Sequence, residues 1–314
     1  MDSEKRCNAV GAAILAYNPD PARIARLIRN LRGQVDELVV FNNAPEDAGR
    51  YEWPIDTPDV MHDGKNVGIA RAMNTAIAEL KRREVDYVVM FDQDSQPETN
   101  YVPQLIADVE LHATKSLVVV GPTILDAVSG FVVRYDLTRW GPKLRRAVAE
   151  DGQWSRVGFA ATSGCLISVK ALEAVGDFDE SLFIDHVDLD WGLRATKSGI
   201  GVWITPNVVM AHELADLTGT IPFTRKEMSL HEDPVRDYFN VRNAILVARK
   251  HSLPFLWRVG LILTQARWIV GTVAAARGSR MARSHMMLRG ICDGVRGIGG
   301  PFTKRRSRWR RSQC

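Results

Sequence analysis

The chain has 314 residues, of which 46% are hydrophobic and 25% charged, and its net charge at pH 7 is +4. This composition predicts one large or two smaller packed α/β domains and excludes a disordered chain. The basic excess is local, because residues 304–311 contain six Lys or Arg residues and no acidic residue. Such a tail suits anionic lipid headgroups or nucleic acid, and a solvated terminus is the equal alternative.

Four cysteines, Cys7, Cys165, Cys292 and Cys314, lie far apart and form no Cys-x-x-Cys pair. That spacing argues against a structural zinc site and a disulfide framework, and it fits a reducing compartment. The first residues are charged, which is not typical of a signal peptide. No uninterrupted apolar run reaches the roughly 18 residues of a membrane-spanning helix. We therefore expect a cytoplasmic protein.

The chain begins with a predicted strand–helix–strand unit over residues 9–15, 21–31 and 37–41. Such a right-handed unit is half of a nucleotide-binding sheet. The turns after its strands carry neither a Gly-x-Gly-x-x-Gly nor a P-loop sequence, which argues against dinucleotide and P-loop binding. They present Tyr17 and Asn42, an aromatic ring and an amide that suit a nucleotide base. Ordinary turn chemistry is the alternative for both residues.

A second helix, predicted over residues 66–83, begins with Asn66 and Gly68. Gly68 allows close approach of the backbone, and Arg71 and Asn74 lie three residues apart on one face of this helix. A guanidinium and an amide near a helix N-terminus can face a phosphate or a ribose. The alternative for Arg71 is a surface position with a packed aliphatic stem.

The most informative stretch is a predicted strand over residues 87–91 followed by Asp92-Gln93-Asp94. In open α/β sheets, ligands bind outside the carboxyl ends of the strands, and alternate side chains at a strand end point the same way. Asp92 and Asp94 are therefore placed to converge on one hard cation, Mg²⁺ or Mn²⁺, together with diphosphate oxygens from a ligand. Solvated acids in a turn are the alternative, because so short a motif recurs by accident.

After a helix over residues 100–112, a short strand over 117–121 is predicted to end at Pro122. Residues 126–157 break this alternation, and we expect a variable loop or hairpin there that shapes a pocket. Three aromatic residues lie in that segment: Tyr135, Trp140 and Trp154.

Two residues near further predicted strands are candidates of a different kind. Cys165 lies in a strand entered through a Gly turn, and a structural thiol is its expected role because no His or Asn constellation supports a nucleophile. His212 follows strands predicted over residues 201–204 and 208–211. A structural histidine is the common case, but its place at a strand end makes it a candidate neutral ligand to the same cation.

Residues 178–194 mix acidic residues with Val, Leu, Phe and Trp. Burying carboxylates near one another requires a metal, a partner Arg or a shifted pKa, and this combination marks functional sites. Asp185 and Asp188 lie three residues apart, so both face one cleft if the helix begins by then. The stretch therefore predicts a catalytic acid or base.

The last part of the chain is predicted to be helical. A helix opens near Arg236, and residues 253–276 form an apolar stretch interrupted by Arg258, Gln265 and Arg267. Three polar residues make this stretch a poor membrane span, whereas Arg, Trp and Leu together suit a helix lying in the membrane interface. A helix packed on the domain or on a second subunit is the equal alternative.

Together these motifs resemble bacterial rhamnosyltransferases in family 2 of the inverting glycosyltransferases. The likeness extends to enzymes of O-antigen assembly and to the second rhamnosyltransferase of rhamnolipid synthesis. It is carried, in the expected order, by Tyr17-Asn18-Pro19, Asn42-Asn43, Asn66 to Asn74, Phe91-Asp92-Gln93-Asp94-Ser95, Ser163-Gly164-Cys165, Leu182 to Asp188 and Tyr238 to Asn243.

The resemblance implies an α/β protein with the glycosyltransferase A fold, in which helices flank a Rossmann-like mixed central sheet. The catalytic domain is expected over residues 1–245, followed by C-terminal amphipathic, membrane-proximal helices and the basic tail over 246–314. The implied donor is dTDP-L-rhamnose, and Gln93 between two Asp residues is typical of the rhamnose branch. The implied donor-binding residues are Tyr17, Asn18, Asn42, Asn66, Gly68, Arg71, Asn74, Asp92, Gln93, Asp94 and Arg242.

The same resemblance assigns chemical roles. Asp94 contacts the Mg²⁺ or Mn²⁺ ion, Asp92 contacts the sugar or ribose, and His212 is the extra metal ligand. Asp188 is the base that deprotonates the acceptor hydroxyl, and Asp185 is the alternative because many family members have Glu-Asp where this chain has Asp185-His186. Metal and Arg neutralise the departing diphosphate, and one displacement inverts the anomeric centre without an enzyme nucleophile.

The expected acceptor is a lipid or a lipid-linked sugar. We expect the enzyme to meet it while bound peripherally at the inner face of the bacterial cytoplasmic membrane, and we expect no nucleic-acid partner. Another nucleotide sugar is the alternative donor. A sugar-phosphate nucleotidylyltransferase is disfavoured because residues 17–21 form no Gly-rich basic loop, and a non-catalytic scaffold leaves the acids unexplained. The identity of the acceptor and a homo-oligomer stay open.

Overall fold

The protein was analysed as a computed structural model. The residues that the structure describes are 8–46, 52–54, 57–112, 117–126, 132–147, 153–212, 217–220, 227–250, 253–276 and 279–303. The basic tail over residues 304–314 lies outside them.

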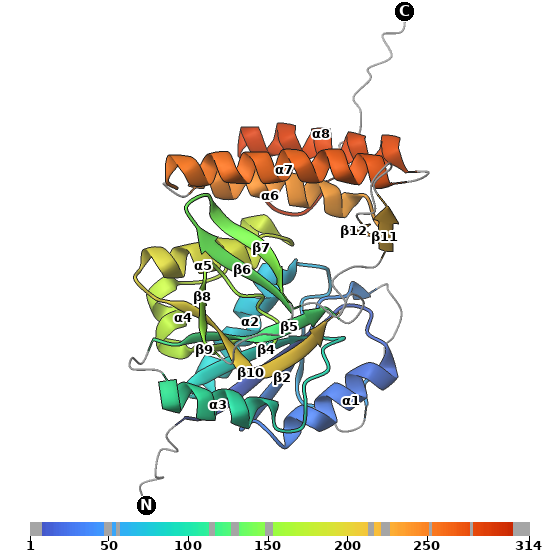
Figure 1. The fold of residues 1–314 in the computed structure, drawn as a ribbon. Helices are drawn as coiled ribbons and strands as arrows, with labels where there is room; N and C mark the ends of the chain where they lie inside the picture. Colours follow the sequence, from blue (N-terminus) through green and yellow to red (C-terminus); the bar gives the residue numbers. More distant parts are fainter. Residues whose placement is uncertain are drawn as a thin grey trace, which may run out of the picture.

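A sheet of ten strands lies at the middle of this part of the molecule, in the order β3-β2-β1-β4-β9-β5-β10-β8-β6-β7 (Figure 1). Two further strands, β11 and β12, form a separate antiparallel pair. The strands are β1 Val10–Ala16, β2 Glu37–Asn42, β3 Val60–His62, β4 Tyr87–Asp92, β5 Val119–Asp126, β6 Val132–Thr138, β7 Gly141–Ala147, β8 Ser155–Val157, β9 Leu166–Ser168, β10 Val202–His212, β11 Leu217–Thr220 and β12 Glu227–Leu230.

The sheet is mixed, and its first half is parallel. β3, β2, β1 and β4 run in one direction, which confirms the parallel strand–helix–strand unit predicted from the N-terminal sequence. β9 is antiparallel to both β4 and β5, and β5 is parallel to β10. The strands β6, β7 and β8 extend the sheet with antiparallel pairs.

Helices cover both faces of the sheet because its central strands are apolar on both sides. On β1, Ala13 and Leu15 pack toward α2, α4 and α5, whereas Ala12 and Ile14 pack toward α1 and α3 (Figure 1). Alternate residues of a strand point to opposite faces, so an unbroken apolar run builds two cores. These helices are α1 Pro21–Arg32, α2 Ile69–Arg82, α3 Tyr101–His112, α4 Val169–Val175 and α5 Val187–Lys197.

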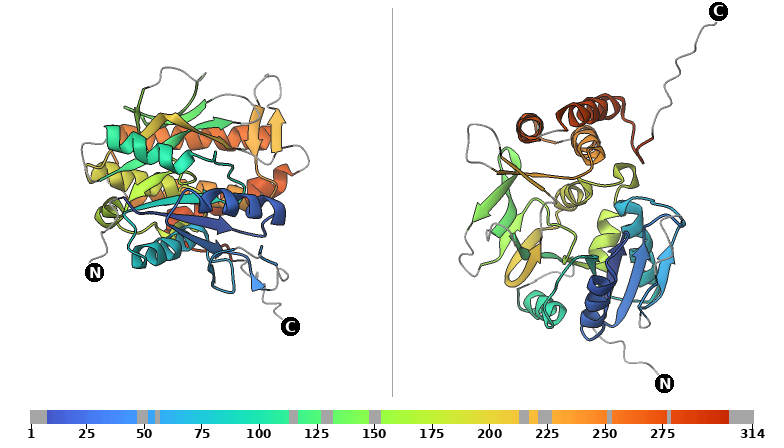
Figure 2. Two further views of the ribbon diagram at one scale, coloured as in Figure 1. Left: turned by 90° about the horizontal axis from the view of Figure 1, so that it is seen from below. Right: turned by 90° about the vertical axis from the view of Figure 1, so that its right-hand side faces the viewer.

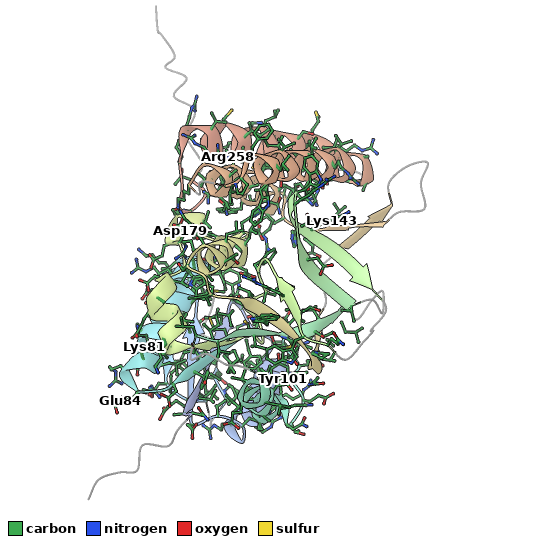
Figure 3. All side chains as sticks on the ribbon, turned by 60° about the vertical axis from the view of Figure 1, so that its left-hand side comes forward. Lys81, Glu84, Tyr101, Lys143, Asp179 and Arg258 are labelled. Atoms are coloured by element: carbon green, nitrogen blue, oxygen red, sulfur yellow. The ribbon has the colours of Figure 1, made fainter. Side chains whose placement is uncertain are left out.

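Three more helices, α6 Val235–Lys250, α7 Phe255–Ala275 and α8 Arg280–Arg296, form an outer layer beyond α5 and the β6–β7 hairpin (Figures 1 and 2). A buried ion pair joins α6 to α8, because Arg283 donates to Asp237 at 2.8 Å and both side chains are almost fully buried. Arg258 lies in this layer, whereas Tyr101 lies on α3 at the other end of the molecule (Figure 3).

The pairing of β5 with β10 differs from the prediction. The sequence predicts a strand end at Pro122, but β5 continues past it. Gly121 pairs with Ile204 and the next pair is Thr123 with Val209, so Pro122 lies at an irregular point in the ladder. A bulge of this kind tolerates a residue without an N–H group. For the same reason the two strands predicted on the partner side are one strand, β10.

β6 and β7 form a hairpin, one of the two structures predicted for this segment. Its turn packs closely on α7, because a Cβ on Gly260 would lie 2.1 Å from the carbonyl oxygen of Trp140. Trp154 packs against Trp203 with ring centroids 6.4 Å apart, and the side chain of Tyr135 lies outside the described ones. The hairpin therefore connects the sheet to the outer layer.

The domain boundary expected between residues 245 and 246 falls inside α6. α6 is one continuous helix across the division proposed between residues 245 and 246. The elements themselves suggest a division before Val235, between the sheet with its helices and the layer α6–α8.

Gly164, which precedes β9, permits a close approach that a substitution tests. Its φ of 76° lies in the left-handed region, and a Cβ there would lie 2.2 Å from the hydroxyl of Tyr101 and 2.1 Å from the methyl of Met210. We expect Gly164→Ala to destabilise the fold, because the backbone conformation costs about 1–2 kcal/mol and overpacking about 1–3 kcal/mol. Gly33→Ala is the control, since a Cβ there meets nothing within 4 Å. Urea unfolding measures both, and equal midpoints for the two variants would contradict the packing described.

Candidate active site

The site begins where β1 and β4 end. These strands are parallel neighbours with Leu15 paired to Asp92, and β2 and β3 lie on the other side of β1. Along the sheet, the order of the strands reverses between β1 and β4, since β2 and β3 continue on one side of β1 and β4 lies on the other. In open α/β sheets, ligands bind outside the carboxyl ends of the strands at such a point. The backbone amide of Tyr17 donates to Oε1 of Gln93 at 2.6 Å, and the ring of Tyr17 is 47% exposed. The turn after β1 and the acidic turn after β4 are therefore joined.

The loop over residues 162–164 supports the acidic turn that follows β4. The amide of Asp92 donates to the hydroxyl of Ser163 at 3.3 Å, and the buried hydroxyls of Ser95 and Ser163 are 2.9 Å apart. The backbone amide of Ser95 also donates to the carbonyl of Asp92 at 3.0 Å. Asp92 is half-buried by these contacts, whereas Asp94 is exposed. Asp94 thus offers its carboxylate to a ligand while the turn that carries it is fixed.

Asp188 lies in the first turn of α5, on the other side of the same loop. The amide of Thr162 donates to one carboxylate oxygen of Asp188 at 3.3 Å, and the hydroxyl of Thr162 lies 3.5 Å from the other. Burial raises the pKa of Asp188 to about 6, the amide of Thr162 opposes this, and the charges of Asp92 and Asp185 add to it. The carboxylates of two distant motifs therefore lie around one loop, and the raised pKa of Asp188 makes it a candidate for proton transfer near neutral pH.

Asp185 is engaged differently. Arg236 donates to its two carboxylate oxygens at 2.8 and 3.2 Å, in the forked geometry that a guanidinium favours. An acidic group held in such a pair is a weaker candidate base than Asp188, which has no Arg or Lys among its described hydrogen-bond partners. Both remain proposals for the catalytic role, and the geometry favours Asp188.

Two of the side-chain amides predicted to bind the donor accept hydrogen bonds from backbone amides two residues later in the chain. Oδ1 of Asn42 accepts from the amide of Ala44 at 3.1 Å, and Oδ1 of Asn66 accepts from the amide of Gly68 at 2.9 Å. Asn18 is exposed beside Tyr17, with a φ of 48°. The side chains of Asn42 and Asn66 thus stabilise turns, which agrees with the turn alternative for Asn42. A contact with a ligand stays a prediction for each.

The start of α2 lies near the loop that precedes α5. Gly68 is buried with a φ of 86°, and a Cβ there would lie 2.7 Å from the carbonyl oxygen of Phe183. The amide of Asn74 donates to the carbonyl of Phe178, and its Oδ1 accepts from the Phe178 amide, both at 2.9 Å. Arg71 is exposed, with Nε 3.2 Å from Asp63. Of these residues, Arg71 is the one whose charged group is open to a diphosphate.

Arg242 lies away from any open surface. It is fully buried in α6, and its guanidinium donates to the carbonyls of Ser181, Leu182 and Gly300 and to the side chain of Asn243. A ligand phosphate could reach it only if these bonds were broken. The donor contact expected for Arg242 therefore needs correction: its side chain supports the loop before α5.

The carboxylates at the end of β4 fit a divalent ion that arrives with its ligand. Within the described ranges, no three His, Cys, Asp or Glu residues are grouped closely enough to cage a metal. Mg²⁺ commonly takes only one or two protein carboxylates and completes its shell with water and phosphate oxygens. Asp94 and Asp92 suit that arrangement. The backbone of His212 ends β10, but its side chain lies outside the described ones, so its role as a ligand stays a prediction.

Sequence reasoning assigned no role in the site to four residues that organise it: Thr162, Ser163, Arg236 and Asn243. Thr162 and Ser163 precede Gly164, and the turn that this glycine predicts is the sequence signal that could have identified them. Arg236 and Asn243 lie on α6, and no sequence pattern shows which loop that helix meets. Cys165 is buried and its pKa is raised by burial, which fits the structural thiol that was predicted.

Comparison with known proteins connects this geometry to a family. Residues 12–176 match the model of glycosyl transferase family 2. The chain is 28% identical over 292 residues to the dTDP-rhamnosyl transferase RfbF of Shigella flexneri, covering 92% of this chain and 96% of that protein.

Solved structures show the same fold at low identity. GalNAc-T7 with UDP, GalNAc and Mn²⁺ aligns with a TM-score of 0.58 at 11% identity, over 94% of this chain and 57% of that one. Residues 1–349 of Staphylococcus aureus TarS, in complex with UDP-GlcNAc, align with a TM-score of 0.51 at 12% identity, over 92% and 81%. The predicted glycosyltransferase A fold is confirmed. The chain belongs to glycosyl transferase family 2 and is a glycosyltransferase.

Proposed function

We propose that the protein transfers L-rhamnose from dTDP-L-rhamnose to an acceptor hydroxyl with inversion at the anomeric carbon. One observation carries the proposal: the loop over residues 162–164 contacts both the acidic turn at Asp92 and the half-buried carboxylate of Asp188. The turn that we assign to the donor and the carboxylate that we assign as base are contacted by the same loop. The donor itself is inferred from the near full-length similarity to a dTDP-rhamnosyl transferase. Another nucleotide sugar is the alternative.

The residues divide the work as follows. The exposed Tyr17 ring and Arg71 guanidinium suit the base and the diphosphate of the donor. Asp94, with Asp92 beside it, would hold Mg²⁺ or Mn²⁺, which supplies positive charge against the departing diphosphate. Asp188 accepts the proton of the acceptor hydroxyl. The acceptor oxygen then bonds to the anomeric carbon as the bond from that carbon to the diphosphate breaks, so one displacement inverts the centre.

We also propose that the acceptor is a lipid or a lipid-linked sugar met at an anionic membrane surface. None of the described helices is long and apolar enough to cross a bilayer. On α7, however, Phe255, Ile262 and Val270 are 77%, 64% and 69% exposed, seven and eight residues apart on one face. The side chains of Arg258 and Arg267 are exposed on the same helix. An apolar stripe beside basic residues matches a helix lying in the lipid interface.

A donor panel tests the proposed reaction. We expect release of dTDP from dTDP-L-rhamnose to exceed release from UDP- and GDP-sugars, and to depend on Mg²⁺ or Mn²⁺. Asp94→Ala should remove most transfer, because one charge that holds the ion is lost, while its exposed position leaves the fold intact. Circular dichroism is the control for folding. Full activity in EDTA contradicts the metal assignment, and preference for another nucleotide sugar contradicts the donor.

The pKa of Asp188 predicts a pH profile. Because the base works ionised, kcat/KM should fall about tenfold per pH unit below pH 6 and be level above pH 7. Asp188→Asn should lower kcat by about 10²- to 10⁴-fold with little change in dTDP affinity. Ionised Asp188 is disfavoured by burial, so this variant should not be less stable than wild type at pH 8. If Asp185→Asn shows this loss instead, Asp185 is the base.

Vesicle cosedimentation tests the membrane surface. We expect binding to anionic vesicles that weakens at high salt, since each basic residue near such a surface contributes about 1 kcal/mol. Ile262→Glu and deletion of residues 304–314 should each reduce binding. Leu111→Glu is the matched control, because Leu111 is 78% exposed on α3, away from the outer layer. A protein that stays in the supernatant at low salt contradicts the proposal, and a dimer broken by Ile262→Glu would identify the stripe as a subunit contact.

A further inference from the structure

The loop that leads into α5 has an unusual backbone. Phe183, Asp185 and His186 have φ values of 67°, 63° and 62°, in the left-handed region that side chains rarely adopt. Six non-glycine residues in the described part of the chain have a positive φ, and three of the six lie within residues 183–186. Such a conformation persists only where the surroundings determine it more strongly than the local backbone does. Asp188 follows His186 by two residues, so these surroundings also set its direction.

One side chain of α6 binds the loop at three points. Nδ2 of Asn243 lies 2.8 Å from the carbonyl oxygen of Leu182, 2.6 Å from that of Ile184 and 2.9 Å from that of Asp185. Asn243 is fully buried. A single amide group can reach three carbonyls so close in sequence only because the loop curls around it. No extended backbone satisfies these contacts.

Arg242 locks Asn243 in place and ties a third segment to the loop. Its Nε donates to Oδ1 of Asn243 at 2.9 Å, and Nη2 donates to the carbonyl of Leu182 at 2.9 Å. Nη1 donates to the carbonyl of Gly300 at 2.6 Å, and the amide of Gly300 donates to the carbonyl of Ser181 at the same distance. The chain that returns after α8 is thus hydrogen-bonded to the start of the loop.

α2 grips the loop from the opposite side. The amide of Ile69 donates to the carbonyl of Phe183 at 2.7 Å, and the absence of a Cβ on Gly68 makes room for the Phe183 ring. That ring stacks on Phe239 of α6 with centroids 5.2 Å apart. The loop is therefore held between the two helices, and a change on α6 is transmitted to residues that lie beside the donor-binding turns.

We propose that Arg242 and Asn243 are positioning residues for the transfer: by holding residues 181–186 in this curled form, they place Asp188 against the acceptor hydroxyl. The inference rests on the proposed role of Asp188 as base. Arg242, which the sequence resemblance implies as a donor-binding residue, and Asn243, which had no assigned role, both act here on the position of the base. Neither side chain touches a reacting atom, so their loss should slow the chemical step and leave donor binding almost unchanged.

Asn243→Ala is the test. We expect kcat to fall by about 10²-fold, the effect of displacing a catalytic group by about 1 Å. The Kd for dTDP with Mg²⁺, measured by calorimetry, should change less than about twofold. Hydrogen exchange should increase at residues 181–188 and stay as in wild type in α1 and α3. If the variant does not fold, Arg242→Lys applies the same test, because it keeps the charge and loses the fork that spans three carbonyls.

Two controls separate positioning from loss of stability. Asn240→Ala makes the same substitution one turn earlier on α6, where the side chain accepts a hydrogen bond from Gln265 at 2.9 Å. Thr205→Val removes a buried hydrogen bond to Asp108 far from the loop. Both should keep kcat within about twofold of wild type. The proposal is overturned if either control loses as much kcat as Asn243→Ala, or if dTDP affinity falls in parallel with kcat.

Failure of the proposed function gives a different result. If wild-type protein binds no dTDP and transfers no sugar, the assigned reaction is wrong, whatever the variants do. If wild type is active and Asn243→Ala keeps both its kcat and its exchange protection at residues 181–188, the reaction stands and the positioning role is wrong.

Discussion

The segment over residues 162–164 is the contact on which the arrangement of the site depends. Its Gly164 amide donates to the carbonyl of Met90 at 2.6 Å, which fixes it against the last residues of β4. Ser163 then supports Asp92, and Thr162 supports Asp188. This segment therefore contacts both the acidic turn and the first turn of α5, and it helps to set the distance between them. Its left-handed glycine and the buried Tyr101 hydroxyl beneath it make the position rigid.

Three carboxylates around this segment differ in exposure and in their partners. These differences suit the three groups to different chemical roles. Asp94 is exposed at the tip of its turn and suits a ligand that brings its own cation. Asp185 is neutralised by Arg236. Asp188 lacks a described cationic partner, and its pKa is raised by burial. Groups of one chemical type thus differ by solvation and partner alone, which is how a site obtains both a metal ligand and a base from aspartate.

The sequence predicted the parallel half-sheet well because its signal is local. Apolar runs such as residues 87–91 read as buried strands, and the acids that follow them must lie at one edge of the sheet. Arg242 shows where such reasoning ends. From the sequence, Arg242 suits a phosphate as well as a loop, and the difference lies in carbonyls about sixty residues earlier. Pro122 misled for a similar reason, since a bulge depends on the partner strand.

The helices of the outer layer contribute to the site through α6. One side of α6 holds the loop before α5 with Asn243, and another side packs on α8 through the buried pair Asp237–Arg283 and the hydrogen bond from Tyr238 to Asp293. Residues 12–176, which match the family model, end before Asp188 and before α6. The part of the chain that matches the family therefore supplies the turns proposed for the donor, whereas the second half of the chain supplies Asp188 and α6, which contacts the loop before it. α6 therefore contacts both the loop that precedes the proposed base and the helix α8 of the outer layer.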